Sequence, residues 1–104
     1  TVVAEQAASD HAPRPRANAI VSLLHCNRAQ GIDRLRDMLE DNRSAHRLSG
    51  LWAVQRHVIT ELAPRVRQIE REDEDARLVR RATATLVRLA RAPRRHVTVK
   101  EIAA

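Results

Sequence analysis

Residues 75–91 read DARLVRRATATLVRLAR, and this stretch predicts one amphipathic helix. Its apolar side chains recur every three or four positions, which is the spacing of a single helix face. The acids that end at Asp75 suit the positive N-terminal end of a helix, and Ala92-Pro93 ends it because proline cannot continue a helix. The buried stripe is expected to be Leu78, Val79, Ala82, Leu86 and Leu89.

Upstream of this stretch, the same spacing predicts four more helices. They cover about residues 15–25, 28–41, 44–59 and 60–71. The loops between them are short, so successive helices are expected to pack as antiparallel hairpins.

Polar residues at the ends of these segments predict how the helices begin and end. Asn27, with Gln30 three positions later, resembles a capping box at the start of the second of these four helices. Asn42 is expected to end that helix in the left-handed conformation, and Ser44 is expected to be the N-cap of the next one. Thr60 opens the following helix, with Pro64 tolerated in its first turn.

The two ends of the chain are also interpreted as helical. Residues 1–9 look like the last turns of a helix. In the tail, Val97 and Val99 alternate like a strand, but residues 98–101 also form a capping box, and we favour a helix that begins there. The chain begins at Thr1, which suggests a processed product or a piece of a longer protein.

Composition limits the kind of core that this chain can build. It contains no Phe or Tyr and one Trp, Trp52, so the core must consist of aliphatic residues, which suits thin layers of packed helices. Two glycines are too few for a Gly-rich phosphate loop. Cys26 is alone, which excludes an internal disulfide and favours a cytoplasmic location. No apolar run is long enough to cross a bilayer. Eighteen arginines against one lysine favour a bacterial origin.

Two segments of the chain align at an offset of 33 residues. Residues 46–54 (HRLSGLWAV) fall over residues 79–87 (VRRATATLV), so that Arg47 meets Arg80 and small residues such as Gly50 meet small residues. The valine, arginine, small-residue, leucine order after an acidic turn resembles the HEAT-like helical repeat family in its short bacterial form, over residues 14–91. Small residues at these places would let neighbouring helices approach closely.

This resemblance implies a fold and a class of function. The expected fold is all-α, a right-handed superhelical stack of antiparallel hairpins at about residues 15–41, 44–71 and 75–104. Residues 1–104 would then be a single segment of a longer array, and a small helical bundle is the alternative. The implied function is a non-catalytic scaffold that binds another protein or a flanking domain of its parent chain.

No pattern in the chain predicts catalysis, a cofactor or a metal ion. The five histidines are scattered, and none is followed by Glu as in metal-binding helical-repeat enzymes similar to this family. His25 and Cys26 are adjacent, so they project in different directions from a helix. We interpret them as an ordinary helix-end histidine and a buried thiol, and Trp52 as a core residue.

Charge is distributed unevenly along the chain. Residues 1–76 carry a net charge of −1, whereas residues 77–104 carry +7. Two interpretations fit this change: acids before a helix and cations toward its C-terminal end complement the helix dipole, or the basic quarter is a binding surface. For the binding surface, phosphate groups of a nucleic acid are the alternative partner to a protein. On a helix, three of its arginines approximate one face and three a neighbouring one. The candidate residues are Arg77, Arg80, Arg81, Arg88, Arg91, Arg94 and Arg95.

Overall fold

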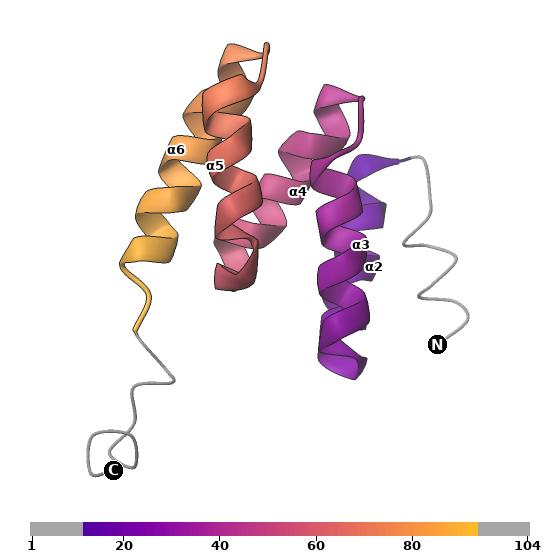
Figure 1. The fold of residues 1–104 in the computed structure, drawn as a ribbon. Coiled ribbons are helices and arrows are strands. Elements are labelled where there is room, and N and C mark those ends of the chain that lie inside the picture. The colour runs from indigo at the N-terminus through magenta and orange to yellow at the C-terminus, as the bar shows by residue number, and fades with distance from the viewer. Residues whose placement is uncertain (1–11, 94–104) are drawn as a thin grey trace, which may run out of the picture.

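The computed structural model describes residues 12–93, and every regular element in this range is a helix (Figure 1). The predicted all-α class is therefore confirmed for this range. The helices expected at residues 1–9 and after residue 97 lie outside the described residues. In chain order the elements are α2 (Pro13–Cys26), α3 (Arg28–Leu39), α4 (Ser44–His57), the 3-10 helix η1 (Thr60–Leu62), α5 (Ala63–Glu72) and α6 (Ala76–Ala90).

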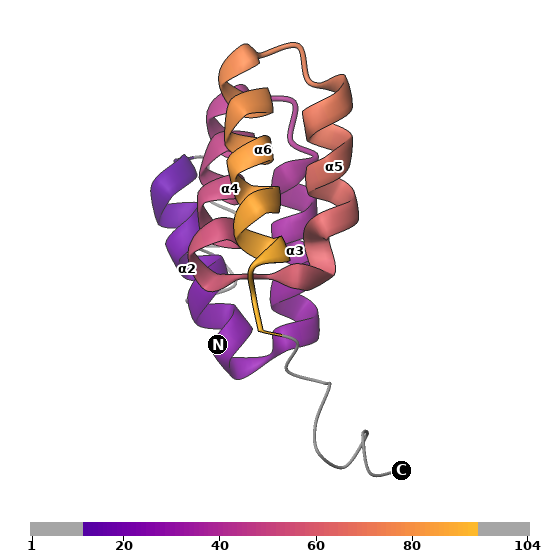
Figure 2. The same cartoon turned by 90° about the vertical axis from the view of Figure 1, so that its left-hand side faces the viewer.

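The helices form two layers, which Figure 2 shows edge-on, with α2, α4 and α6 on one side and α3 and α5 on the other. α4 packs against both α2 and α6, so these three helices stand side by side. The other layer contains α3, which packs against α2 and α4, and α5, which packs against α6. The smallest principal-axis extent of the Cα atoms is 16 Å, as expected for two layers whose helix axes are about 8–10 Å apart. Every second helix therefore belongs to the same layer.

Aliphatic side chains fill the space between the layers, as the composition predicted. Trp52 packs against this cluster but remains partly exposed, so it is only in part the core residue that was expected. The fully buried members come from all the helices and include Ile20, Leu35, Met38, Leu51, Val54, Leu62, Val66 and Leu78.

The predicted stripe of α6 is largely confirmed. Leu78, Ala82 and Leu89 are buried, whereas Val79 and Leu86 lie at the edge of the stripe and are half-buried. The fourth buried position is a threonine that the apolar pattern did not predict, Thr85. Its hydroxyl donates to the Arg81 carbonyl oxygen at 2.8 Å, which satisfies the polar group inside the helix.

Two helix starts confirm the sequence prediction and two helix boundaries do not. The Asn27 side chain accepts from the Gln30 N–H at 3.2 Å, and Asp75 accepts from the Arg77 N–H at 2.9 Å. The prediction for Ser44 was wrong, since α4 already begins at that residue and its side chain forms no cap hydrogen bond. Instead, the Asp41 carboxylate accepts from the Arg43 N–H at 2.9 Å, so an aspartate in the preceding turn holds this helix start.

The left-handed residue also differs from the prediction. Asn42 was expected to adopt it, but within residues 12–93 the one non-glycine residue with positive φ is Val58, at φ 52°. Val58 ends α4, which was expected to run to Ile59. This turn directs the Ile59 N–H to the Val54 carbonyl oxygen at 3.0 Å and leaves the Ile59 side chain 2% exposed. Burial of Ile59 offsets the cost of about 1–2 kcal/mol for a left-handed non-glycine residue.

The starts of α4 and α6 are 32 residues apart, one less than the predicted offset, and the starts of α2 and α4 are 31 residues apart. α4 begins at Ser44 and α6 at Ala76, so Gly50 corresponds to Ala82, and both are buried. Counted from these helix starts, Arg47 falls opposite Val79, one position before Arg80 of the predicted match. Among residues 12–93, no helix has both the length and the apolar character needed to cross a membrane.

Candidate functional site

The predicted arginines of α6 lie together on one face. All five that the structure describes are exposed, and each lies three, four or seven positions from the exposed Ala84. These spacings place them on the same side of a helix, opposite the buried stripe, so the expected division into two faces is replaced by one broad face. The five are Arg77, Arg80, Arg81, Arg88 and Arg91; Arg94 and Arg95 lie outside the described residues.

The layer that contains this face has no acidic residue in its helices. α2, α4 and α6 together carry eight arginines and no Asp or Glu. The helices of the other layer carry five acids, and more acids stand in the turns before α4 and α6. A layer without carboxylates cannot neutralise its own outer face. The sequence analysis missed this separation because it compared the two ends of the chain and not alternate helices.

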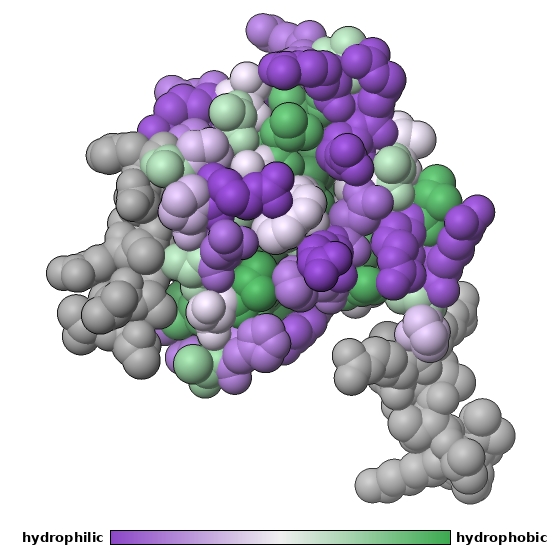
Figure 3. Space-filling view, turned by 180° about the vertical axis from the view of Figure 1, so that it is seen from behind, coloured by the Kyte–Doolittle hydropathy of each residue, from purple (hydrophilic) through white to green (hydrophobic). Residues whose placement is uncertain are grey.

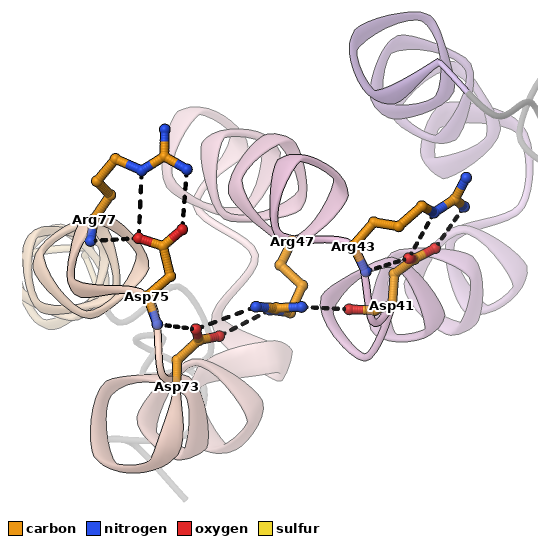
Figure 4. A network of polar contacts seen from close by, with 6 residues as sticks. All are labelled: Asp41, Arg43, Arg47, Asp73, Asp75 and Arg77. Atoms are coloured by element: carbon orange, nitrogen blue, oxygen red, sulfur yellow. Dashed lines mark hydrogen bonds and ion pairs between the residues drawn. The ribbon is translucent and has the colours of Figure 1, made fainter.

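Three of these eight arginines are held by aspartates of the turns. Arg16 donates to Asp41 at 2.7 Å, and both side chains are largely buried. Arg47 donates to both carboxylate oxygens of Asp73, at 2.8 and 3.2 Å, and to the Asp41 carbonyl oxygen at 2.8 Å, so it connects the two turns (Figure 4). Arg77 donates to the carboxylate of Asp75, the N-cap of its own helix.

Two carboxyl groups of this network have lowered pKa values. The guanidinium of Arg43 donates to both oxygens of Asp41 and holds the pKa of that carboxyl well below its usual range, and Arg16 acts in the same direction. The side-chain hydrogen bond from Arg77 lowers the pKa of Asp75. Both acids therefore stay ionised, and this end of the layer is close to neutral.

Trp52 lies on the outer side of α4, between the arginines of α2 and α6. The Cζ atom of Arg14 lies 4.0 Å from its ring centroid, which is a cation–π contact. His57 meets the ring edge-on at a centroid distance of 6.4 Å. Arg56 follows one turn after Trp52 and is exposed on the same side. Two arginines, Arg14 and Arg56, thus lie beside the tryptophan.

Gln55 joins α4 to the arginines of α6. Its side-chain oxygen accepts from Arg81 at 3.3 Å and lies 3.3 Å from the hydroxyl oxygen of Thr85. Figure 3 looks onto the side of the molecule away from α3 and α5, where hydrophilic side chains surround more hydrophobic ones. We call this surface the arginine face, and it consists of Arg14, Trp52, Arg56, Arg77, Arg80, Arg81, Arg88 and Arg91.

Histidine and cysteine do not gather into a site in the part of the chain that the structure describes. There, no group of three His, Cys, Asp or Glu side chains is placed to hold a metal ion. Cys26 is exposed, so the prediction of a buried thiol was wrong: it is the last residue of α2 and lies outside the buried stripe of that helix. The His25 Nδ1 is 2.8 Å from the Val21 carbonyl oxygen. Partial burial lowers the pKa of His57, and the nearby Arg56 and His25 act in the same direction.

The opposite side of the molecule has two hollows along α5 that the sequence did not indicate. One has a volume of about 310 Å³ and is lined by residues of α3, α5 and the two turns, and the other has a volume of about 200 Å³ and is lined partly by η1. Arg65 borders both hollows and reaches across to Glu40 at 2.8 Å. Both hollows are lined by acids as well as arginines, so neither favours a ligand of one charge.

Comparisons with protein-family models, with curated proteins and with solved structures each find no match. The candidate site therefore rests on its own geometry: a helical layer whose outer face is cationic, centred on one partly exposed tryptophan.

Proposed function

We propose that the protein is a non-catalytic interaction scaffold that binds an acidic partner protein through the arginine face. The observation that carries this proposal is the absence of any carboxylate in α2, α4 and α6, next to eight arginines. Such a face has a positive potential that attracts an acidic surface and orients it before contact.

We further propose that the fold is a HEAT-like stack of hairpins and not a bundle around a shared axis. Two features support this arrangement. α4 lies between α2 and α6 in one layer, and an arginine at the fourth residue of α2 and of α4 bonds an aspartate in the turn that leads into the next helix of the layer. These arginines are Arg16 and Arg47. Repeated side-by-side packing with the same junction is how solenoid units stack.

A protein partner fits the arginine face better than a nucleic acid does. Protein interfaces are enriched in Trp and Arg and depleted in Lys, Asp and Glu, and the helices of this layer have that composition. Stacking on single-stranded nucleic acid uses several aromatic side chains, whereas this chain has only Trp52. Binding to the phosphate backbone of a duplex is the second candidate, and the four exposed arginines of α6 together with Arg91 at its C-cap favour it.

The proposal is tested with two defined polyanions, poly-L-glutamate and a DNA duplex of equal charge, at low and moderate salt. We expect saturable binding of the polypeptide that is lost when Arg80, Arg81 and Arg88 are replaced by alanine. The matched control replaces three arginines of the other layer by alanine, and it keeps binding. The control residues are Arg34, Arg67 and Arg71.

Circular dichroism of both triple variants verifies that the helix content is unchanged. If neither polyanion binds at low salt, the proposed function is wrong. If the control variant loses as much affinity as the α6 variant, the attraction comes from net charge and the arginine face has no special role. If only the duplex binds, the second candidate replaces the first.

A further inference from the structure

The arginine face has an apolar centre, which indicates that its partner carries apolar as well as acidic side chains. Trp52 is half-buried, so part of this residue is accessible to a partner. Leu48 precedes it by one turn on the same side of the helix and is also half-buried. On α6, the exposed Ala84 occupies the position equivalent to Trp52 at the 32-residue spacing.

Cationic side chains surround this centre from three helices. Arg14 reaches over the ring from α2, at 4.0 Å from the centroid. Arg56 follows Trp52 by one turn of α4, and Arg81 reaches from α6 to Gln55. An interface with an apolar centre and a polar rim is the usual anatomy of protein recognition, and Trp and Arg are enriched among the central residues that carry most of the binding energy.

From this arrangement, and resting on the proposed function, we infer that the partner segment is an acidic amphipathic helix. One of its large apolar side chains packs on Trp52, Leu48 and Ala84, and its carboxylates pair with the arginines that surround them. A helix supplies both chemistries from one side because residues three and four positions apart share a face. An extended acidic chain or a duplex supplies charge without the apolar contact at the centre.

Arg14 has a specific role in this complex. Within residues 12–93 no carboxylate bonds it, and its partner is the aromatic ring. A guanidinium held at a ring keeps donors for a carboxylate, and arginine is suited to both contacts at once. An acid of the partner that lies next to its apolar anchor would bond Arg14 without displacing it from Trp52.

The test uses two synthetic peptides of identical composition, rich in Glu and Leu. In one, the order places the leucines on a single helix face, and in the other the order is scrambled. Affinity is measured by the anisotropy of a fluorescein label on the peptide, so that Trp52 can be varied. We expect the amphipathic peptide to bind at least tenfold more tightly than the scrambled one.

Variants of the protein then locate the contact. Trp52→Ala is expected to weaken the amphipathic peptide by about thirtyfold, the loss typical of a central anchor, and Arg14→Ala by up to about fivefold. Trp52→Leu keeps apolar volume against the core and covers the case in which the alanine variant does not fold. The control, Arg67→Ala on α5, leaves the affinity within about twofold.

The outcomes separate this inference from the proposed function. If both peptides bind equally and both depend on the α6 arginines, the face binds acidic peptides whatever the order of their residues. The inference is then overturned while the proposed function stands. The inference also fails if Trp52→Leu, folded by circular dichroism, binds the amphipathic peptide as tightly as the original protein. If neither peptide binds at low salt, both proposals are wrong.

Discussion

Replacement of Gly31 by alanine tests how closely α2 and α3 pack. Gly31 is buried in α3, and a Cβ atom added to it would lie 2.8 Å from the Cα atom of Leu24 and 2.7 Å from its Cδ2. The first of these is a backbone atom of α2, so no change of rotamer relieves the contact. The two helices would have to separate by about 0.6 Å at this point to restore ordinary contact.

The expected magnitude follows from two opposing effects. Alanine is favoured over glycine inside a helix by about 1 kcal/mol. Overpacking typically costs about 1–3 kcal/mol, and a backbone collision belongs to the upper part of that range. We therefore expect Gly31→Ala to lower the free energy of unfolding by about 1–2 kcal/mol, which corresponds to a fall in Tm of roughly 4–8 °C for each kcal/mol in a domain of this size.

Gly50 provides the matched control, because it is also buried inside a helix. A Cβ atom there would lie 3.0 Å from Cδ2 of Leu39 and 3.4 Å from Cγ of Met38, both atoms of flexible side chains that can give way. The gain in helix propensity offsets this smaller strain, so Gly50→Ala should stay within about 0.5 kcal/mol of the original protein.

The assay for both variants is urea unfolding, followed by circular dichroism and by the fluorescence of Trp52, which is the one tryptophan in the chain. Coincident transitions from the two probes establish that unfolding is two-state. If Gly31→Ala is as stable as the original protein, or if Gly50→Ala is the more destabilising change, then the close approach of α2 to α3 does not determine how Gly31→Ala affects stability.

Three further predictions concern charges and the thiol. Arg47→Ala leaves the buried Asp73 carboxylate without its main partner and should cost about 2–4 kcal/mol in urea unfolding, whereas Arg36→Ala breaks an exposed pair and should cost less than about 1 kcal/mol. The pKa of Asp41 is lower in the folded protein than in the unfolded chain, where it is about 4, so ionised Asp41 stabilises the fold above pH 4 and this contribution is lost as the pH falls further. Asp41→Asn should therefore flatten the fall in the free energy of unfolding between pH 5 and pH 2. Cys26 is exposed, so it should react with a chromogenic disulfide reagent in the native protein, at a rate that urea below the unfolding transition does not raise.

The helical segments of this chain could be predicted because their information is local. The apolar spacing of α6 and the side chains of Asn27 and Asp75 belong to the segment that they organise. Errors occurred where the deciding contact came from another place. Ser44 does not cap α4 because Asp41 occupies the turn before it, and Val58 adopts a left-handed conformation because Ile59 has to reach the core.

The arginines of α6 could also be predicted as a surface, because they are absent from the apolar stripe of their own helix. The remainder of the arginine face could not. Arg14, Trp52 and Arg56 lie far from α6 in the sequence, and only the layer formed by α2, α4 and α6 brings them beside it. The charge summed over residues 1–76 is −1 and hides this layer, because the sum combines the arginines of α2 and α4 with the acids of α3, α5 and the turns.

The position of the acids explains how this protein keeps a cationic face without losing the ion pairs that join its helices. Asp41 and Asp73 stand in turns, where they bond Arg16 and Arg47 near the N-terminal ends of their helices. Carboxylates at these ends also complement the helix dipoles. The ion pairs that join the helices of this layer therefore lie at one end of the helices. The helices α2, α4 and α6 contain no acid for the arginines farther along α4 and α6, and these arginines remain available to a partner.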